Sequence, residues 1–155
     1  MMNMRISNRE LEDRLSRFKR VCRESGRKLT QQRLEIFREV ARTGDHPDVE
    51  SVYRRVRKQL PTVSLDTVYR TLWMLKDLGL VNTLESTHSR TRFDANLERH
   101  HHFVCTGCGM TVDFEDRGFD KLTIPDSVKS MGDMKELQVE VRGLCKECAS
   151  KKESK

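Results

Sequence analysis

Four of the five cysteines form two Cys-x-x-Cys pairs, Cys105 with Cys108 and Cys145 with Cys148. Two thiolates separated by two residues can hold one ion from a tight turn, and two such turns supply the four sulfurs of a tetrahedral zinc site. The redox alternative is a thioredoxin-like dithiol, which needs only one pair, close to a βαβ pattern. The pattern favours Zn(II), and because four sulfur ligands leave no open position, we expect the ion to be structural and not catalytic.

Three consecutive histidines offer a second set of metal donors. Because alternate residues of an extended strand share a face, His100 and His102 project together while His101 points away. The carboxylates available to them are Asp94, just upstream, and Asp113, after the first cysteine pair. Mixed nitrogen and oxygen donors suit Fe(II), Mn(II) or Zn(II) and do not choose among them. The alternative is a histidine run at the surface that binds nothing.

The net excess of positive charge lies entirely in the first half of the chain. The 155 residues carry a net charge of +6, but residues 1–83 hold 18 Lys and Arg against 11 Asp and Glu, and residues 84–155 hold 12 against 13. A basic half of this kind is typical of phosphate binding, with a merely solvated helix surface as the alternative. A mean hydropathy of −0.72 indicates a small core, which a bound metal would help to stabilise.

The sequence predicts a cytoplasmic protein that does not contact a membrane. No apolar run approaches the roughly 20 residues needed to span a bilayer. The N-terminal residues, MMNMRISNREL, lack the apolar stretch of a secretory signal. We therefore expect a compartment in which thiols stay reduced.

Apolar residues at spacings of three and four predict helices over residues 8–25, 31–42, 48–58 and 64–78. Thr30 and Ser64 are the expected N-caps of the second and fourth of these helices. Gly26 and Gly79 are expected to end the first and the fourth. Two short strands should follow, over residues 80–85 and 90–95, joined by a turn at 86–89.

Helices followed by a two-stranded hairpin predict a winged helix-turn-helix, in which the helix over residues 64–78 enters the major groove of DNA. We expect its inner face to consist of Val68, Leu72, Leu75 and Leu78. The polar and aromatic side chains outside that face, with the arginines of the hairpin, are candidate DNA contacts: Ser64, Asp66, Thr67, Tyr69, Arg70, Arg90 and Arg92. We expect Trp73 to pack against neighbouring helices. As alternatives, Tyr69 packs in the same way and the hairpin arginines are only solvated.

After residue 95 the sequence pattern changes from helix-like to mostly strand-like. Strand-like runs at 101–105 and 109–114 flank the first cysteine pair. Residues 118–131 are expected to form a helix, and residues 137–145 alternate like a strand. A piece of this size has a small core, so zinc binding would contribute to its folding.

The chain resembles the ferric uptake regulator family over nearly its whole length. The matching segments, in the order and spacing of the family, are LTQQRLEIF, GDHPDVESVY, SLDTVYRTLWMLKDLGLV, RFD, HHHFVCTGCG, VDF and GLCKEC. The resemblance implies an α+β protein with a winged helix-turn-helix DNA-binding domain over residues 1–95. A small α/β dimerisation domain with a structural zinc site of four cysteines would follow over residues 96–155. It further implies a homodimer that represses transcription from a double-stranded DNA operator when metal is bound.

Within the family, the chain is most similar to the peroxide-responsive repressors, which bind Fe(II) or Mn(II) through three histidines and two aspartates. By motif, the implied ligands of this regulatory metal are His46, Asp94, His100, His102 and Asp113. Aspartate at position 94 favours the peroxide sensor, because the iron-uptake repressors usually carry glutamate there. The resemblance implies that Fe(II) reduces H₂O₂ and that the product oxidises His46 or His100, which then binds metal poorly and releases DNA.

Two segments depart from the family pattern. Gln31 stands where the family commonly has proline, which matters little at the start of a helix. The stretch KELQVEVRG lacks the histidine of a further metal site found in many uptake regulators, so that a second exchangeable site is doubtful here, although Glu136 offers an oxygen ligand.

Three other functions stay open at this point. An iron- or zinc-uptake repressor of the same family is the nearest. A small metallohydrolase is more remote, because no HExxH-like arrangement is visible and the basic half would be left unexplained, so we do not expect an enzyme. The last alternative is a structural zinc module that mediates protein contacts.

Overall fold

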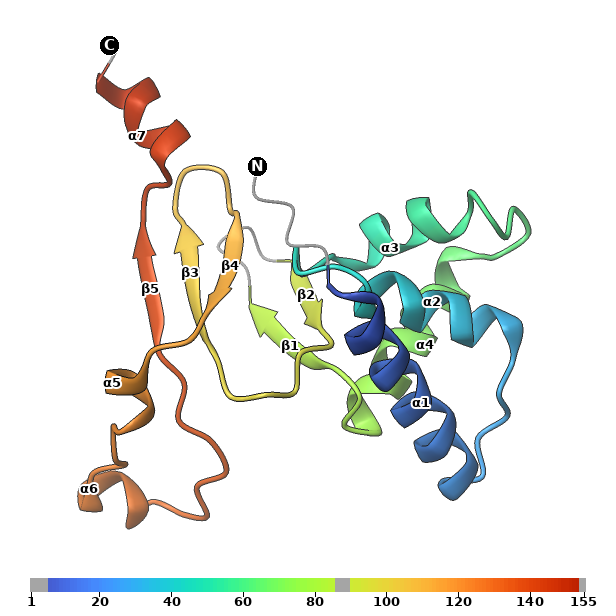
Figure 1. Cartoon of the computed structure of the whole chain (residues 1–155), viewed down its shortest axis with the longest axis horizontal. Coiled ribbons are helices and arrows are strands. Elements are labelled where there is room, and N and C mark those ends of the chain that lie inside the picture. Colours follow the sequence, from blue (N-terminus) through green and yellow to red (C-terminus); the bar gives the residue numbers. More distant parts are fainter. Residues whose placement is uncertain (1–5, 86–89, 154–155) are drawn as a thin grey trace. The chain divides into compact units, whose positions relative to one another are not determined.

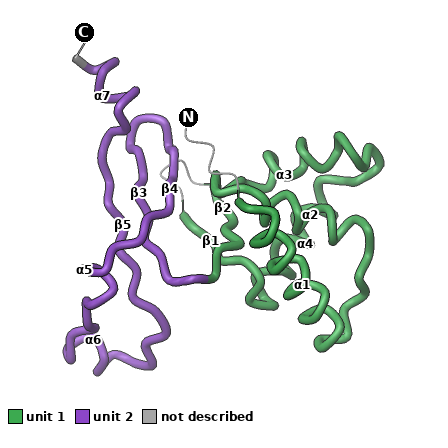
Figure 2. Tube along the Cα trace, in the orientation of Figure 1, with its two compact units in different colours: residues 1–97 green, residues 98–155 purple. Residues whose placement is uncertain are grey.

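The computed structural model describes residues 6–85 and 90–153, and it divides into two compact units, residues 1–97 and 98–155 (Figure 2). The boundary lies two residues after the one predicted from the sequence. The structure is α+β, as predicted, with the helices concentrated in unit 1 (Figure 1). In the described part of the chain, no helix is both long and apolar enough to cross a membrane. The turn predicted at 86–89 lies outside the described residues.

Unit 1 contains four helices, α1 (Asn8–Glu24), α2 (Gln31–Ala41), α3 (Val49–Val56) and α4 (Leu65–Asp77). Each begins after a residue whose side-chain oxygen accepts a hydrogen bond from a first-turn backbone N–H: Ser7, Thr30, Asp48 and Ser64. Gly26 and Gly79 follow α1 and α4 with φ of 68° and 69°, a conformation that costs glycine little. The predicted caps and helix ends are thus confirmed.

A hairpin of strands β1 (Asn82–Glu85) and β2 (Thr91–Asp94) completes the winged helix-turn-helix. Phe18 and Phe37 stack at 4.8 Å between ring centroids and join α1 to α2. Trp73 is packed, but edge-on against Phe93 of strand β2 at 5.8 Å and not against a neighbouring helix as expected. Cys22 is fully buried in this core, where it serves as a small apolar side chain.

Unit 2 contains a three-stranded sheet of β3 (His101–Cys105), β4 (Thr111–Phe114) and β5 (Glu140–Gly143), in the order β4-β3-β5. Strand β4 runs antiparallel to β3 and β5 runs parallel to it. The central strand therefore carries the histidines at one end and Cys105 at the other. The connection from β4 to β5 contains two single-turn helices, α5 (Arg117–Asp120) and α6 (Asp126–Lys129).

Two predictions for unit 2 were wrong, and one helix was not predicted. The helix expected over 118–131 is broken into α5 and α6, because Pro125 lacks an N–H and keeps the residue before it out of the helical region. The strand expected over 137–145 shortens to β5. Helix α7 (Lys146–Glu153) was not predicted, because KECASKKE has no apolar stripe to indicate it.

Candidate metal centres and nucleic-acid interface

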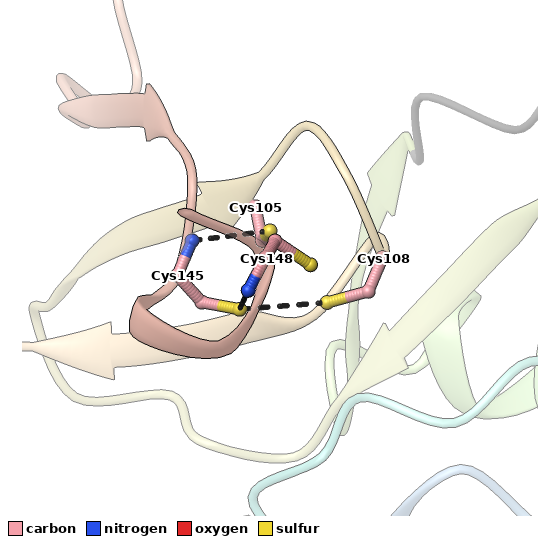
Figure 3. A group of neighbouring side chains, drawn as sticks. All are labelled: Cys105, Cys108, Cys145 and Cys148. Carbon is pink, nitrogen blue, oxygen red and sulfur yellow. Dashed lines mark hydrogen bonds between the residues drawn. The ribbon is translucent and has the colours of Figure 1, made fainter. Parts of the chain in front are cut away.

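The four cysteines of the two pairs converge at one end of the sheet of unit 2 (Figure 3). Cys105 ends β3 and Cys108 lies in the turn after it, while Cys145 immediately precedes α7 and Cys148 lies within it. Their sulfur atoms all lie within 4.8 Å of one another, and Cys108 Sγ is 3.9 Å from Cys145 Sγ. A tetrahedral zinc ion with ordinary Zn–S bonds needs sulfurs about 3.8 Å apart. The donor set therefore suits a structural zinc ion.

Backbone groups hold the first cysteine turn in shape. The Cys105 N–H donates to the carbonyl of Met110 at 2.8 Å, and the Gly109 N–H donates back to the Cys105 carbonyl at 2.9 Å. The Cys145 N–H donates to Cys105 Sγ at 3.3 Å, which joins the second turn to the first. Gly107 was not singled out from the sequence, yet a Cβ there would lie 3.0 Å from Cys148 Sγ.

Cys105 and Cys148 of this cluster have pKa values shifted in opposite directions. Backbone N–H groups of Cys108 and Cys145 lower the pKa of Cys105 to about 6. Hydrogen bonding to Cys145, then burial, raise the pKa of Cys148 to about 12. Thiolates this close together repel one another, and a bound divalent cation removes that repulsion.

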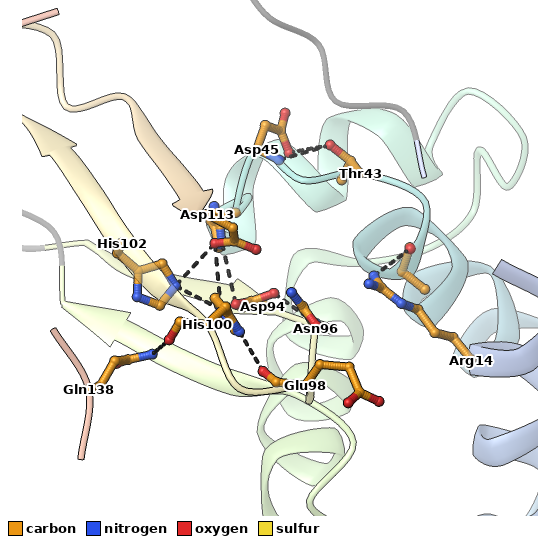
Figure 4. Close-up of polar contacts among 12 residues, drawn as sticks. Arg14, Thr43, Asp45, Asp94, Asn96, Glu98, His100, His102, Asp113 and Gln138 are labelled. Atoms are coloured by element: carbon orange, nitrogen blue, oxygen red, sulfur yellow. Dashed lines mark hydrogen bonds and ion pairs between the residues drawn. The ribbon is translucent and has the colours of Figure 1, made fainter. Parts of the chain in front are cut away.

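The candidate ligands His46 and Asp94 meet within unit 1. His46 Nε2 lies 3.4 Å from Asp94 Oδ2, and both residues are buried. Asp94 ends β2 and accepts a hydrogen bond from the Asn96 N–H at 2.8 Å (Figure 4). The loop of His46 is joined to the same strand, because the Phe93 N–H donates to the Pro47 carbonyl at 3.0 Å.

His46 has a φ of 48°, which costs a side-chain-bearing residue roughly 1–3 kcal/mol unless its surroundings impose it. The residues on either side of it are held in place. Asp45 pairs with Arg55 of α3 and accepts a hydrogen bond from the Thr43 hydroxyl at 2.7 Å. Burial would raise the pKa of Asp45, but the hydrogen bonds from Arg55 and Thr43 hold it below its ordinary value. Asp48 forms a β-bridge with Arg92.

The other three candidate ligands meet within unit 2 (Figure 4). His102 on β3 lies directly opposite Asp113 on β4, with Nε2 3.2 Å from Asp113 Oδ1. His100 Nε2 lies 3.5 Å from the same oxygen and 3.0 Å from His102 Nε2. His100 Nδ1 lies 2.6 Å from the Glu98 carbonyl, so a proton on Nδ1 leaves Nε2 as the metal-binding nitrogen. These converging donors suit Fe(II) or Mn(II).

His101 points the other way, as strand alternation predicts. Its ring packs against Phe114 at 5.7 Å and Phe119 at 5.6 Å between ring centroids. Its Nε2 lies 3.1 Å from Asp120 Oδ1, and its Nδ1 accepts from the Val139 N–H at 3.2 Å. Because both nitrogens have these partners, His101 holds the β4–β5 connection against the sheet.

The candidate DNA contacts at the start of α4 include exposed side chains and the N-cap residue. Tyr69 is 51% exposed, and Arg70 and Asp66 are exposed and form an ion pair at 3.0 Å. Ser64 is the N-cap, whose hydroxyl accepts from the Thr67 N–H at 3.1 Å. The outer face of the first two turns therefore presents an aromatic ring and a guanidinium.

Of the two hairpin arginines, Arg90 has carboxylate partners. Arg90 Nη1 lies 3.3 Å from Asp48 Oδ2 and 3.0 Å from Glu50 Oε2, and its side chain is 60% exposed. Arg92 is half-buried. Any contact of Arg90 with DNA would have to compete with these two carboxylates.

Comparison with known proteins gives matches along most of the chain. The model of the "Ferric uptake regulator family" matches residues 24–141. The "Peroxide-responsive repressor PerR" of Staphylococcus aureus is 30% identical over 148 residues, which cover 96% of this chain and 100% of that protein.

Two solved structures are similar in fold. The Helicobacter pylori ferric uptake regulator Fur has a TM-score of 0.75 at 27% identity, covering 94% of this chain and 96% of that one. The Campylobacter jejuni peroxide stress regulator has a TM-score of 0.66 at 28% identity, covering 86% and 98%.

Proposed function

Because this chain belongs to the ferric uptake regulator family, we propose that it is a metal-dependent transcriptional repressor that senses peroxide. The observation that carries the proposal is its donor set, three histidines and two aspartates in two preformed groups. Aspartate at position 94 and the similarity to a peroxide-responsive repressor favour peroxide sensing over metal-uptake control.

In this proposal one regulatory Fe(II) or Mn(II) takes ligands from both units: His46, Asp94, His100, His102 and Asp113. An ion held by both groups would fix the angle between the units, and in a homodimer this would set the spacing of the two α4 helices. Metal favours that conformation only by binding it more tightly than the others. The spacing required for one helical turn of DNA is roughly 34–36 Å.

When bound, Fe(II) would activate H₂O₂ beside the ligand imidazoles. His46 or His100 would then gain one oxygen atom of the peroxide while the other leaves as water, so that the imidazole is oxidised and H₂O₂ is reduced; the oxidised ring would have a poorer nitrogen donor. The two ligand groups are then no longer held together, so DNA is released. The role of this chain is to hold the imidazoles with Nε2 toward the ion, as the contact between His100 Nδ1 and the Glu98 carbonyl does.

The other parts of the protein support this assignment. Large apolar side chains on unit 2 are exposed in the single chain, as expected of a surface that pairs with a second copy: Leu122, Val128, Met131, Met134, Val141 and Leu144. The zinc ion of the four cysteines is structural. We propose that the protein acts in the cytoplasm on double-stranded DNA, and that it is not an enzyme.

The test is operator binding with Fe(II) or Mn(II), each with and without H₂O₂, followed by peptide mass spectrometry. We expect both metals to support binding, and peroxide to abolish it with Fe(II) only. One added oxygen atom should appear on a peptide holding His46 or His100. Metal-dependent binding that peroxide leaves unchanged, with no added oxygen, would instead indicate the alternative function, an iron- or zinc-uptake repressor, which the similarity to the Helicobacter regulator favours.

A further inference from the structure

Unit 1 contains a basic hollow between the α1–α2 loop, the start of α2 and the first turns of α4. Its volume is about 480 Å³. The charged side chains that line it are Arg27, Lys28, Arg33, Arg70 and Asp66. We call this cavity, with the side chains that line it, the basic hollow.

The lining carries four cationic side chains against one carboxylate, and that carboxylate, Asp66, is already paired with Arg70. The N-termini of α2 and α4 also border the hollow, through Thr30 and Thr67. Unsatisfied backbone N–H groups at a helix start add partial positive charge. The potential in the hollow is therefore strongly positive.

Two of these cations have no evident role in holding the fold. Arg33 donates to the Lys28 carbonyl at 2.7 Å and so fixes the loop. By contrast, Arg27 and Lys28 are exposed, and among residues 6–85 and 90–153 no carboxylate forms an ion pair with either side chain. Cations gathered without counter-charges repel one another, so the arrangement favours an anionic partner.

The position of the hollow indicates which anion. Arg70 lines it, and the same turns of α4 expose Tyr69 on the surface assigned to the major groove. Phosphates border that groove on both sides, and half to two-thirds of protein–DNA hydrogen bonds go to phosphate and sugar. We propose that the basic hollow seats backbone phosphates of the duplex into which α4 docks, with Arg27 and Lys28 as sequence-independent contacts. This inference rests on the proposed function.

The test variant is Arg27→Ala/Lys28→Ala in the full-length, zinc- and Mn(II)-loaded protein. Because phosphate contacts carry no sequence information, affinity should fall on the order of tenfold for the operator and for an unrelated duplex alike. The slope of log K against log salt should become shallower by about 1.8, or about 0.9 for each phosphate that is no longer neutralised. The ratio of operator to non-operator affinity should stay unchanged.

Two matched variants distinguish phosphate binding by Arg27 and Lys28 from a general effect of removing positive charge. Lys121→Ala/Lys135→Ala removes the same charge from exposed positions of unit 2 and should leave the slope near that of the wild type. The exchange Arg27→Lys/Lys28→Arg keeps the charge and should keep the affinity. Circular dichroism and metal content show whether each variant is folded and loaded.

The inference is overturned if the alanine variant binds both duplexes with wild-type affinity and slope, or if the unit 2 variant loses as much. It is also overturned if only operator binding falls, since that would make these residues base contacts. If the wild-type protein binds no duplex with any metal, the proposed function itself is contradicted. This outcome differs from those that overturn only the role of Arg27 and Lys28.

Discussion

At the scale of single residues, the zinc cluster includes a close approach at Gly107 that a larger residue would crowd. A Cβ on Gly107 would lie 3.0 Å from Cys148 Sγ, 3.1 Å from Cys148 Cβ and 3.2 Å from Leu144 Cδ2. These atoms belong to the second cysteine turn, whose sulfurs must stay near the other two. A side chain at Gly107 therefore pushes one pair of ligands away from the other.

We expect Gly107→Ala to weaken zinc binding about 10- to 100-fold, the range found when groups that orient metal ligands are removed. Competition with a chromogenic chelator measures the change. Gly132→Ala is the control, since its nearest neighbour would be Met134 Cε at 3.8 Å, an ordinary contact. Equal zinc retention by both variants would show that the two turns adjust without cost.

At the scale of elements, the loop of His46 and the hairpin behave as one structure. Asp48 accepts a hydrogen bond from the Ser51 N–H at 2.8 Å to cap α3, and it also pairs with Arg90 at 3.3 Å. Glu50, in the first turn of α3, is the second partner of Arg90. The arginine expected to contact DNA is thus held by carboxylates at the start of α3.

We expect Glu50→Gln to raise DNA affinity modestly, because it removes one of the two carboxylates that compete with phosphate for Arg90 and leaves Asp48 as the other. The unfolding free energy should change by less than about 1 kcal/mol, since the pair is exposed. Fluorescence anisotropy at several salt concentrations measures the affinity. In the Arg90→Ala background the gain should vanish. If Glu50→Gln raises affinity equally with and without Arg90, the effect comes from reduced repulsion and not from a released arginine.

The sequence predicted elements whose signals are local. Apolar stripes and the N-caps Thr30 and Ser64 indicate helices, because each of these signals lies within a short stretch of the sequence. Helix α7 has no such stripe, so its residues carry no local signal that predicts a helix. The break at Pro125 also has a local cause, because proline lacks an N–H and keeps the residue before it out of the helical region.

The candidate site likewise contains features that local patterns predict and contacts that they do not. The spacing of the cysteine pairs predicted their cluster, and alternation predicted that His101 turns away from His100 and His102. Contacts between distant segments could not be predicted from the sequence. Arg90 and Glu50 are 40 positions apart, and nothing near either residue indicates their pairing.

At the scale of the whole molecule, the two units differ in what stabilises them. Unit 1 has a continuous apolar core, with Phe18, Ile36, Phe37, Leu72 and Leu75 almost fully buried. In unit 2 the buried apolar residues within the described part of the chain are Val104 and Cys105. A unit with so little core needs a metal ion and a partner surface to hold its sheet.

Removing zinc with a strong chelator should therefore unfold unit 2 and leave α1–α4 folded. Circular dichroism should retain most of the helical signal, and sedimentation should change from dimer to monomer, because the exposed apolar residues of unit 2 lose their framework. Cys145→Ser/Cys148→Ser should behave like the chelated protein without any chelator. If the zinc-free protein keeps its dimer and its sheet, apolar contacts between copies hold unit 2 by themselves, and zinc adds only rigidity.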